Sequence, residues 1–287
     1  MTEKAVKREP YIKLILTIFA LSSLFFLFLI FIFILAEGLP VFYRAGFSKI
    51  IFGLKWAPTK GFFGIFPMIV SSFLVTFGSL IIAAPLGLAC ATYLAEYAGK
   101  KRKLFLKPAL ELLAGIPSVV YGFLGVIYIV PLVREYLGGS GFSLVSTAVV
   151  LGVMVLPTII SISYDALMSV PRAYREGSLA MGATKWQTIN KVVIPTAKSG
   201  ILASFILGMG RAVGETMAVI MVAGNALKIP TSVLDPLRTL TSNIALELAY
   251  AAGDHRKSLF STGIVLLVII MILNYIANFV VKKKVIK

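Results

Sequence analysis

Long apolar runs without a charged side chain constrain this chain of 287 residues more than any other feature. A helix needs about 20 mostly apolar residues to cross a bilayer core, because no water is present there to satisfy backbone polar groups. Six stretches have the required length, and we expect membrane spans at residues 14–36, 67–95, 112–133, 144–164, 199–224 and 258–281. These windows predict an all-α, polytopic membrane protein with six transmembrane helices.

The overall composition excludes the main classes of water-soluble protein. Hydrophobic residues make up 59% of the chain and charged residues only 14%, whereas a soluble domain is about 25% charged. A soluble protein, a disordered chain and a disulfide scaffold are therefore excluded. Residues 14–36 are too long for a signal-peptide core of about 7–15 residues, and no clear small-x-small cleavage site follows them. We expect them to be retained as the first span.

The distribution of the net charge of +16 indicates how the chain is oriented in the membrane. The segments that connect the six expected spans, with the two tails, carry 18 Lys and Arg on one side of the membrane and 9 on the other, and Arg211 lies within a span. Because Lys and Arg are enriched in cytoplasmic connections, the side with 18 is expected to be cytoplasmic, with both termini inside. We therefore expect contact with membrane lipid and no nucleic acid as a partner.

Residues that could carry catalysis or hold a cofactor are scarce. Cys90 and His255 are the single cysteine and the single histidine, so neither a His/Cys metal site nor a Ser–His pair within a span is expected. No G-x-x-x-x-G-K-S/T loop for ATP occurs, and Gly210 with Gly214 forms a G-x-x-x-G pair suited to helix packing. We predict no metal, no cofactor in this chain and no enzymatic activity. An ion gradient, passive conduction, or ATP hydrolysis by another chain must drive its function.

The expected cytoplasmic connection at 171–195 has strong local signals for two short helices. Pro171 suits the start of the first helix, Gly182 suits a left-handed residue that ends it, and Thr184 with Gln187 forms a T-x-x-Q capping box for the second. Pro195 limits that second helix. Such a short hairpin has no core of its own, so either a partner protein or the lipid headgroups must cover its large side chains: Tyr174, Leu179, Met181 and Trp186.

This hairpin resembles the EAA loop of ABC importer permeases, whose pattern is E-A-A-x₃-G-x₉-I-x-L-P. Glu176 matches the acid, Gly182 the glycine and Pro195 the final proline, whereas four positions differ: Gly177, Ser178, Val192 and Ile194. The resemblance implies a type I ABC importer permease fold in which this hairpin docks on an ATP-binding subunit, so that ATP is bound by the partner. The residues implied in coupling are Glu176, Gly182, Tyr174, Met181, Trp186 and Pro195.

Further stretches are similar to the permeases of phosphate ABC importers of the CysTW/Pst type, and most of all to PstC. They are Trp56-x-Pro58, Phe63–Pro67, Tyr93–Tyr97, Glu111–Gly122, Gly210–Ala218 and Asp235–Thr241. The resemblance implies that the substrate is inorganic phosphate and that the protein is located in a bacterial or archaeal cell (inner) membrane. The implied partners are a PstA-like second permease, two PstB-like ATP-binding subunits and an extracytoplasmic PstS-like phosphate-binding protein.

The same resemblance divides the chain into three parts. Residues 1–66 would form a cytoplasmic tail, the first span and an outer loop; 67–281 the permease core with the hairpin; and 282–287 a basic cytoplasmic tail. Two alternatives stay open. One is a permease for another oxyanion, such as sulfate or molybdate, and the other is an anion carrier that works alone on a gradient.

Arg211 and Glu215 are the charged residues within the fifth expected span. At a spacing of four on one helix their side chains could meet. A charge at mid-bilayer normally faces the bundle interior or a water-filled path, and the planar guanidinium suits phosphate. The pair could therefore line a phosphate path, form a structural salt bridge, or pair with another subunit.

The two long outer loops have features of their own. Residues 236–252 place Leu237, Leu240, Ile244 and Leu248 at helical spacing, which predicts a short amphipathic helix. The loop at 37–66 carries basic residues that are suited to attract an anion or an acidic partner surface: Arg44, Lys49, Lys55 and Lys60.

Overall fold

The computed structural model describes residues 9–285, and helices dominate this part of the chain, as the apolar windows predict. The only strands within it are β1 (Trp56–Ala57) and β2 (Phe62–Phe63), which pair antiparallel with Trp56 opposite Phe63. The helices are α2 (Glu9–Ala45), α3 (Phe47–Ile51), α4 (Phe66–Thr92), α5 (Lys100–Gly115), α6 (Ser118–Leu124), α7 (Val130–Tyr136), α8 (Leu144–Met168), α9 (Arg172–Ala180), α10 (Lys185–Thr188), α11 (Ile194–Thr196), α12 (Lys198–Gly214), α13 (Met217–Val222), α14 (Leu240–Glu247) and α15 (Gly253–Val285).

Short irregular turns connect several of these helices. The 3₁₀ turn η1 (Pro58–Lys60) joins the two strands, and the π turns η2 (Tyr93–Tyr97), η3 (Gly125–Ile129) and η4 (Ile189–Val193) continue α4, α6 and α10. Residues 1–8 and 286–287, which include most of the expected N-terminal tail and the end of the C-terminal one, lie outside the described residues.

Five helical segments are long and apolar enough to cross a membrane, and α12 together with the turns before it gives a sixth when the bent pair is counted as one span. The five are Ile12–Ala45, Phe66–Tyr97, Ser118–Tyr136, Leu144–Met168 and Gly253–Ile276. Helix α12 follows the turns from Lys185 to Thr196 after a bend of 68°. The expected start of the third span is wrong: it begins at Ser118 and not at residue 112. Residues 112–115 end α5, and Ile116 and Pro117 are extended with ψ of 129° and 141°, since the residue before a proline is disfavoured in the helical region.

Helices α4, α8 and α12 form the centre of the bundle, where small residues let the backbones approach closely. A Cβ atom added at Gly87 of α4 or at Gly208 of α12 would lie 2.6 Å or 2.9 Å from the Ile159 side chain of α8. Hydroxyls join the same helices, since Ser163 and Ser204 hydrogen-bond at 2.8 Å. Helices that associate in lipid favour such small and hydroxylated residues, because the hydrophobic effect does not drive them together there.

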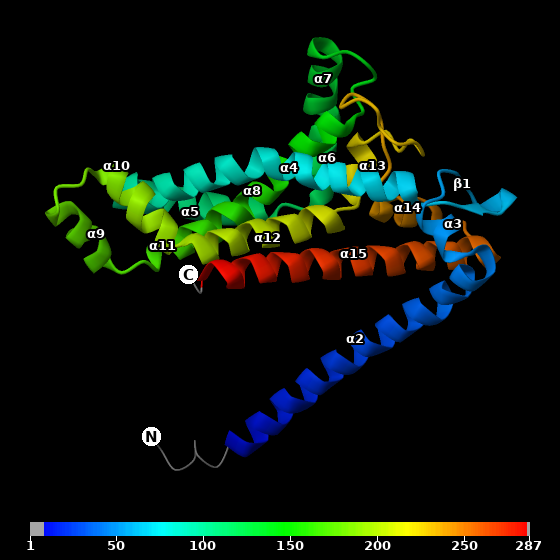
Figure 1. The fold of residues 1–287 in the computed structure, drawn as a ribbon, viewed down its shortest axis with the longest axis horizontal. Coiled ribbons are helices and arrows are strands. Elements are labelled where there is room, and N and C mark those ends of the chain that lie inside the picture. Colours follow the sequence, from blue (N-terminus) through cyan, green and yellow to red (C-terminus); the bar gives the residue numbers. More distant parts are fainter. Residues whose placement is uncertain (1–8, 286–287) are drawn as a thin grey trace.

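Helix α2 leaves the bundle along most of its length (Figure 1). It is held at the end opposite α9 and α10, which we name the outer end after the orientation expected from the sequence. There the Ser261 hydroxyl of α15 donates to the Gly38 carbonyl at 2.7 Å. The large apolar side chains of α2 from Ile12 to Phe33 are exposed. The start of α2 and the end of α15 both point toward the end of the molecule that carries α9 and α10 (Figure 1). A chain that crosses a membrane an even number of times has its two ends on the same side, and these two helix ends agree with that.

The loop before α14 packs on the outer end of α8. The backbone carbonyls of Asp235 and Val233 accept hydrogen bonds from Leu144 and Val145 at the first turn of α8. Backbone and hydroxyl hydrogen bonds from Thr231, with a further bond from the Ser232 backbone, lower the pKa of the Asp235 carboxyl to about 2. The expected amphipathic helix is real but shorter than 236–252, because Thr239 caps α14 and the helix ends at Glu247.

Candidate functional site

The hairpin at 171–195 folds as its local signals predict. Helix α9 ends before Gly182, whose φ of +81° is the left-handed conformation that glycine adopts at low cost. Thr184 then begins α10 with a complete capping box: its hydroxyl accepts from the Gln187 backbone at 3.3 Å, and the Gln187 amide oxygen accepts from the Thr184 backbone at 2.9 Å. The helix–turn–helix shape is therefore set locally.

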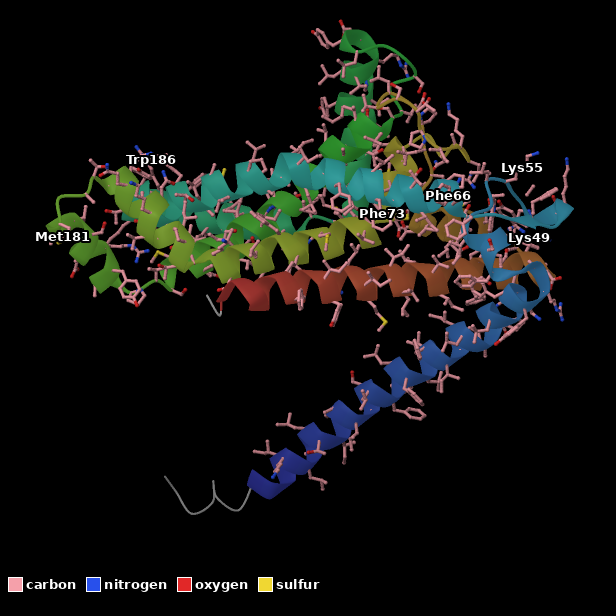
Figure 2. All side chains as sticks on the ribbon, viewed as in Figure 1. Lys49, Lys55, Phe66, Phe73, Met181 and Trp186 are labelled. Atoms are coloured by element: carbon pink, nitrogen blue, oxygen red, sulfur yellow. The ribbon has the colours of Figure 1, made fainter. Side chains whose placement is uncertain are left out.

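The hairpin exposes the side chains that the sequence singled out. Tyr174 is 54% exposed, Met181 89% and Trp186 63%, and the last two lie at the far end of the molecule (Figure 2). Glu176, Gly182 and Pro195 are also exposed, and Pro195 is the second residue of the short helix α11 near the bend into α12. An apolar patch on a hairpin with no core of its own fits a partner surface.

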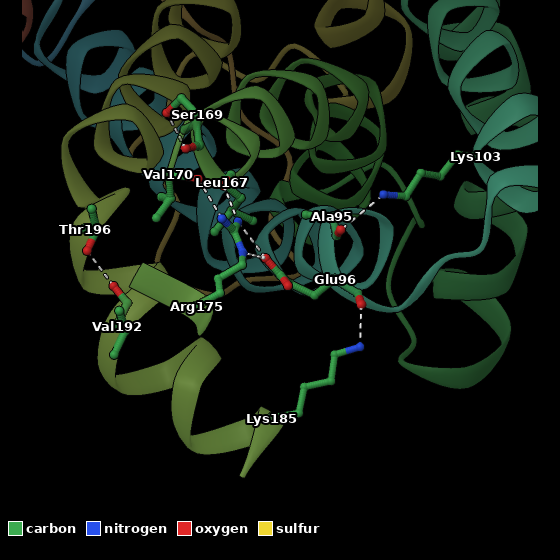
Figure 3. A network of polar contacts seen from close by, with 11 residues as sticks. Ala95, Glu96, Lys103, Leu167, Ser169, Val170, Arg175, Lys185, Val192 and Thr196 are labelled. Carbon is green, nitrogen blue, oxygen red and sulfur yellow. Dashed lines mark hydrogen bonds and ion pairs between the residues drawn. The ribbon is translucent and has the colours of Figure 1, made fainter. Parts of the chain in front are cut away.

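An ion pair that sequence reasoning missed anchors this hairpin to the membrane helices. Arg175 donates through Nε and Nη2 to one oxygen of Glu96 at 3.1 and 2.9 Å, and it also donates to the carbonyls of Val170 and Leu167 at 2.6 and 2.8 Å (Figure 3). The Arg175 and Glu96 side chains are only 19% and 11% exposed. Arg175 thus joins α9 to the end of α4 through η2 and to the end of α8.

Lys185 adds a second attachment on the other helix of the hairpin. Its Nζ donates to the backbone carbonyl of Glu96 at 2.6 Å and lies 4.4 Å from the centre of the Tyr97 ring. In the sequence, Glu96 stands out as a single carboxylate between two tyrosines, in the stretch Tyr93–Tyr97. Nothing in the neighbouring residues indicates which cation it binds. Both hairpin helices are therefore attached to η2, which continues α4.

A matched pair of glycine substitutions tests the local design of the hairpin. We expect Gly182→Ala to destabilise it by about 1–2 kcal/mol, because a side chain disfavours the left-handed region. Amide hydrogen exchange over 183–190 should then be about 5–30-fold faster. Gly177→Ala in α9 is the control, since a Cβ there meets no atom within 4 Å and alanine favours the helix. Equal exchange rates in both variants would contradict the assignment.

The expected pairing of Arg211 with Glu215 is wrong, because the fifth span is not one helix from 199 to 224. Helix α12 ends at Gly214, Glu215 is extended with φ −69° and ψ 132°, and α13 begins at Met217. The Glu215 carboxylate accepts a hydrogen bond from the Ala218 backbone at 3.1 Å, and its carbonyl accepts one from Thr241 at 2.8 Å. The break is therefore stabilised by the outer loop, and Glu215 satisfies the start of α13.

Without Glu215, the Arg211 side chain forms no hydrogen bond and no ion pair among the residues that the structure describes. It shares a face of α12 with three neighbours at helical spacing that are exposed in this chain: Leu207, Gly210 and Gly214. A Cβ at either glycine would meet nothing within 4 Å, so none of the described helices packs on the G-x-x-x-G pair. An unpaired cation within a span on an open face requires water, an anion or a second subunit beside it.

A buried network at the outer end joins segments that are far apart in the chain. The Glu247 carboxylate accepts from Arg238 Nη1 and Trp56 Nε1, each at 2.8 Å, and it contacts His255 Nε2 at 2.8 Å. Arg238 also donates to Asn243 at 3.1 Å. The network fixes the β1 segment, the outer loop, α14 and the start of α15 together, and the sequence singled out neither Glu247 nor His255 for this role.

A model of the family described as binding-protein-dependent transport system inner membrane component matches residues 83–286, which include the hairpin and the Arg211 face. The chain belongs to this family. It is an importer permease, a membrane component of an ABC transporter whose ATP is hydrolysed by a partner subunit, and not a catalyst itself.

Known proteins are similar to this permease over most of its length. It is 44% identical over 258 residues to the probable ABC transporter permease protein YqgH of Bacillus subtilis, which covers 86% of this chain and 84% of that protein. It is 30% identical over 292 residues to the phosphate transport system permease protein PstC of Pasteurella multocida, with 93% and 91% covered. A bacterial ABC transporter involved in the import of alginate shares the fold, with a TM-score of 0.66, 17% identity and 98% of each chain covered. The fold is that of type I importer permeases.

Proposed function

We propose that this chain is a PstC-like permease subunit that carries inorganic phosphate across a bacterial or archaeal inner membrane, using ATP hydrolysis by a partner. The observation that carries the proposal is the similarity over 93% of the chain to a phosphate transport system permease protein. The unpaired guanidinium of Arg211 adds to it, since a planar fork of donors suits a tetrahedral oxyanion. The proposed partners are a PstA-like permease, two PstB-like ATPases and a PstS-like binding protein.

The proposed mechanism uses the two ends of the molecule separately. The binding protein delivers phosphate on the outer side, and closure of the ATPase subunits moves the exposed hairpin, including Glu176, Met181 and Trp186. Arg175 and Lys185 pass that displacement to the ends of α4 and α8. Arg211 contacts phosphate in the opened path, and because Glu215 is engaged with α13, the carboxylate does not hold Arg211 between cycles.

Arg211→Gln tests this proposal directly. We expect phosphate uptake by the complete importer in proteoliposomes to fall by about 10–100-fold or more, because a charge-assisted hydrogen bond is worth about 1.5–3 kcal/mol. The complex should still assemble with its ATPase, since the Arg211 side chain forms no ion pair with another described residue.

Arg134→Gln is the matched control, because it removes an exposed guanidinium at the far end of α7. Normal uptake by Arg211→Gln would contradict the assigned role. Competition by sulfate or molybdate as effective as that by phosphate would favour the other oxyanions. Anion flux through this chain reconstituted alone would favour a stand-alone carrier.

A further inference from the structure

The outer end of the molecule contains a basic hollow of about 640 Å³ next to α3. Arg44, Lys49 and Lys55 line it, together with apolar and glycine residues, and no carboxylate does (Figure 2 labels the two lysines). Arg44 has an ion pair with exposed Asp254 at 3.3 Å. Lys49 and Lys55 have no ion pair among the described residues, so the hollow holds two uncompensated cations.

An apolar groove of about 530 Å³ lies on the other side of α3, between α2, α4 and α15. Its walls include Phe42 of α2, Phe47 of α3, Phe73 of α4 and Val268 of α15, and nearly all of its surface is carbon. The described residues leave this groove open between α2 and α15, and α2 diverges from the other helices along the rest of its length (Figure 1).

Residues of α3 line both hollows. Phe47 and Ile51 line the apolar groove, whereas Lys49 and Ile50 line the basic hollow. Large apolar side chains surround this point and are more than half exposed: Phe47, Phe52, Leu54 and Phe62. Tyr43, which lines the apolar groove and is 86% exposed, is of the residue type enriched at the boundary between lipid tails and headgroups.

We propose that this double cavity binds one phospholipid with an anionic headgroup in the outer leaflet. The headgroup phosphate lies between Lys49 and Lys55, and an acyl chain lies in the groove against Phe73 and Val268. Free phosphate matches the hollow alone and leaves the apolar groove unoccupied, whereas a phospholipid supplies an anion and an apolar chain in one molecule. The bound lipid joins α2 to α4 and α15 at the place where the helices separate.

The test measures lipid retained by the purified complete importer, using native mass spectrometry with phosphatidylglycerol or phosphatidylethanolamine supplied in detergent. A lysine beside an anionic membrane surface contributes about 1 kcal/mol, so K49Q combined with K55Q should weaken phosphatidylglycerol retention by about 30-fold. The control is K60Q combined with R134Q, because neither of these exposed outer residues lines the hollow or the groove. It should retain lipid as the unmodified importer does.

A second variant keeps the charges and fills the groove. Val268→Trp should also reduce retention, since Val268 lines the groove and is 46% exposed. Equal retention of the two lipids, equal loss in the control variant, or displacement of phosphatidylglycerol by millimolar inorganic phosphate would each overturn the proposal. The readout does not involve phosphate transport, so it stands or fails separately from the proposed function.

Discussion

Replacing Arg175 by glutamine is expected to leave an assembled importer that hydrolyses ATP but no longer transports. The substitution removes the guanidinium that joins Glu96 to the carbonyls of Leu167 and Val170, and Glu96 keeps a buried, unpaired charge. Breaking a buried ion pair in this way costs about 3–5 kcal/mol. Because α9 is then no longer fixed to α4 and α8, we expect uptake in proteoliposomes to fall by about 100-fold or more while ATP hydrolysis continues.

Two further variants separate the ion pair from a general loss of charge. Arg172→Gln removes the neighbouring guanidinium on α9, which is exposed and forms no hydrogen bond within the described chain, and it should transport normally. Arg175→Lys keeps the charge but loses the fork of donors, so its uptake should be intermediate. Co-purification of the ATPase with each variant shows whether the hairpin still docks. Normal uptake by Arg175→Gln would contradict the transmission of movement through Glu96.

Glu247→Ala is expected to be the most destabilising single substitution at the outer end. It removes the acceptor of Arg238 and Trp56 and the partner of His255, and the Arg238 side chain, only 15% exposed, loses its counter-charge. We expect a loss of about 3–5 kcal/mol. Thermal unfolding of the detergent-purified complex, followed by tryptophan fluorescence, should show a melting temperature lower by about 10 °C.

Asp254→Ala is the matched control for Glu247→Ala. It also removes a carboxylate at the outer end, but the ion pair of Asp254 with Arg44 is exposed on both sides. Exposed pairs contribute about 0–1 kcal/mol, so the melting temperature should hardly change. A similar decrease in both variants would show that the buried network has no special role. If Glu247→Ala unfolds during purification, Glu247→Gln, which retains an acceptor for Trp56, allows the same comparison.

The features that could be predicted from the sequence are those that depend on neighbouring residues. Apolar windows locate the crossings because a helix in lipid must satisfy its own backbone groups. The hairpin was predictable because Gly182 and the Thr184–Gln187 box act within a few residues, and both adopt the expected geometry. Helix α12 is the counterexample: its apolar pattern continues past residue 214, and only the contact of Glu215 with Thr241 shows why the helix stops.

The long-range polar contacts that organise the two ends were decided by tertiary structure alone. Arg175 meets Glu96 across 79 residues, and Trp56 meets Glu247 across 191, so no local pattern indicates either partner. By contrast, the spacing of Arg211 and Glu215 suggested a pair that the fold separates. The sequence by itself determined the class of protein, the crossings and the shape of the hairpin, because lipid solvation and helix capping act along the chain. The tertiary structure alone decided which charges are paired and left Arg211 open, because the energy of a charge depends on what lies beside it in space.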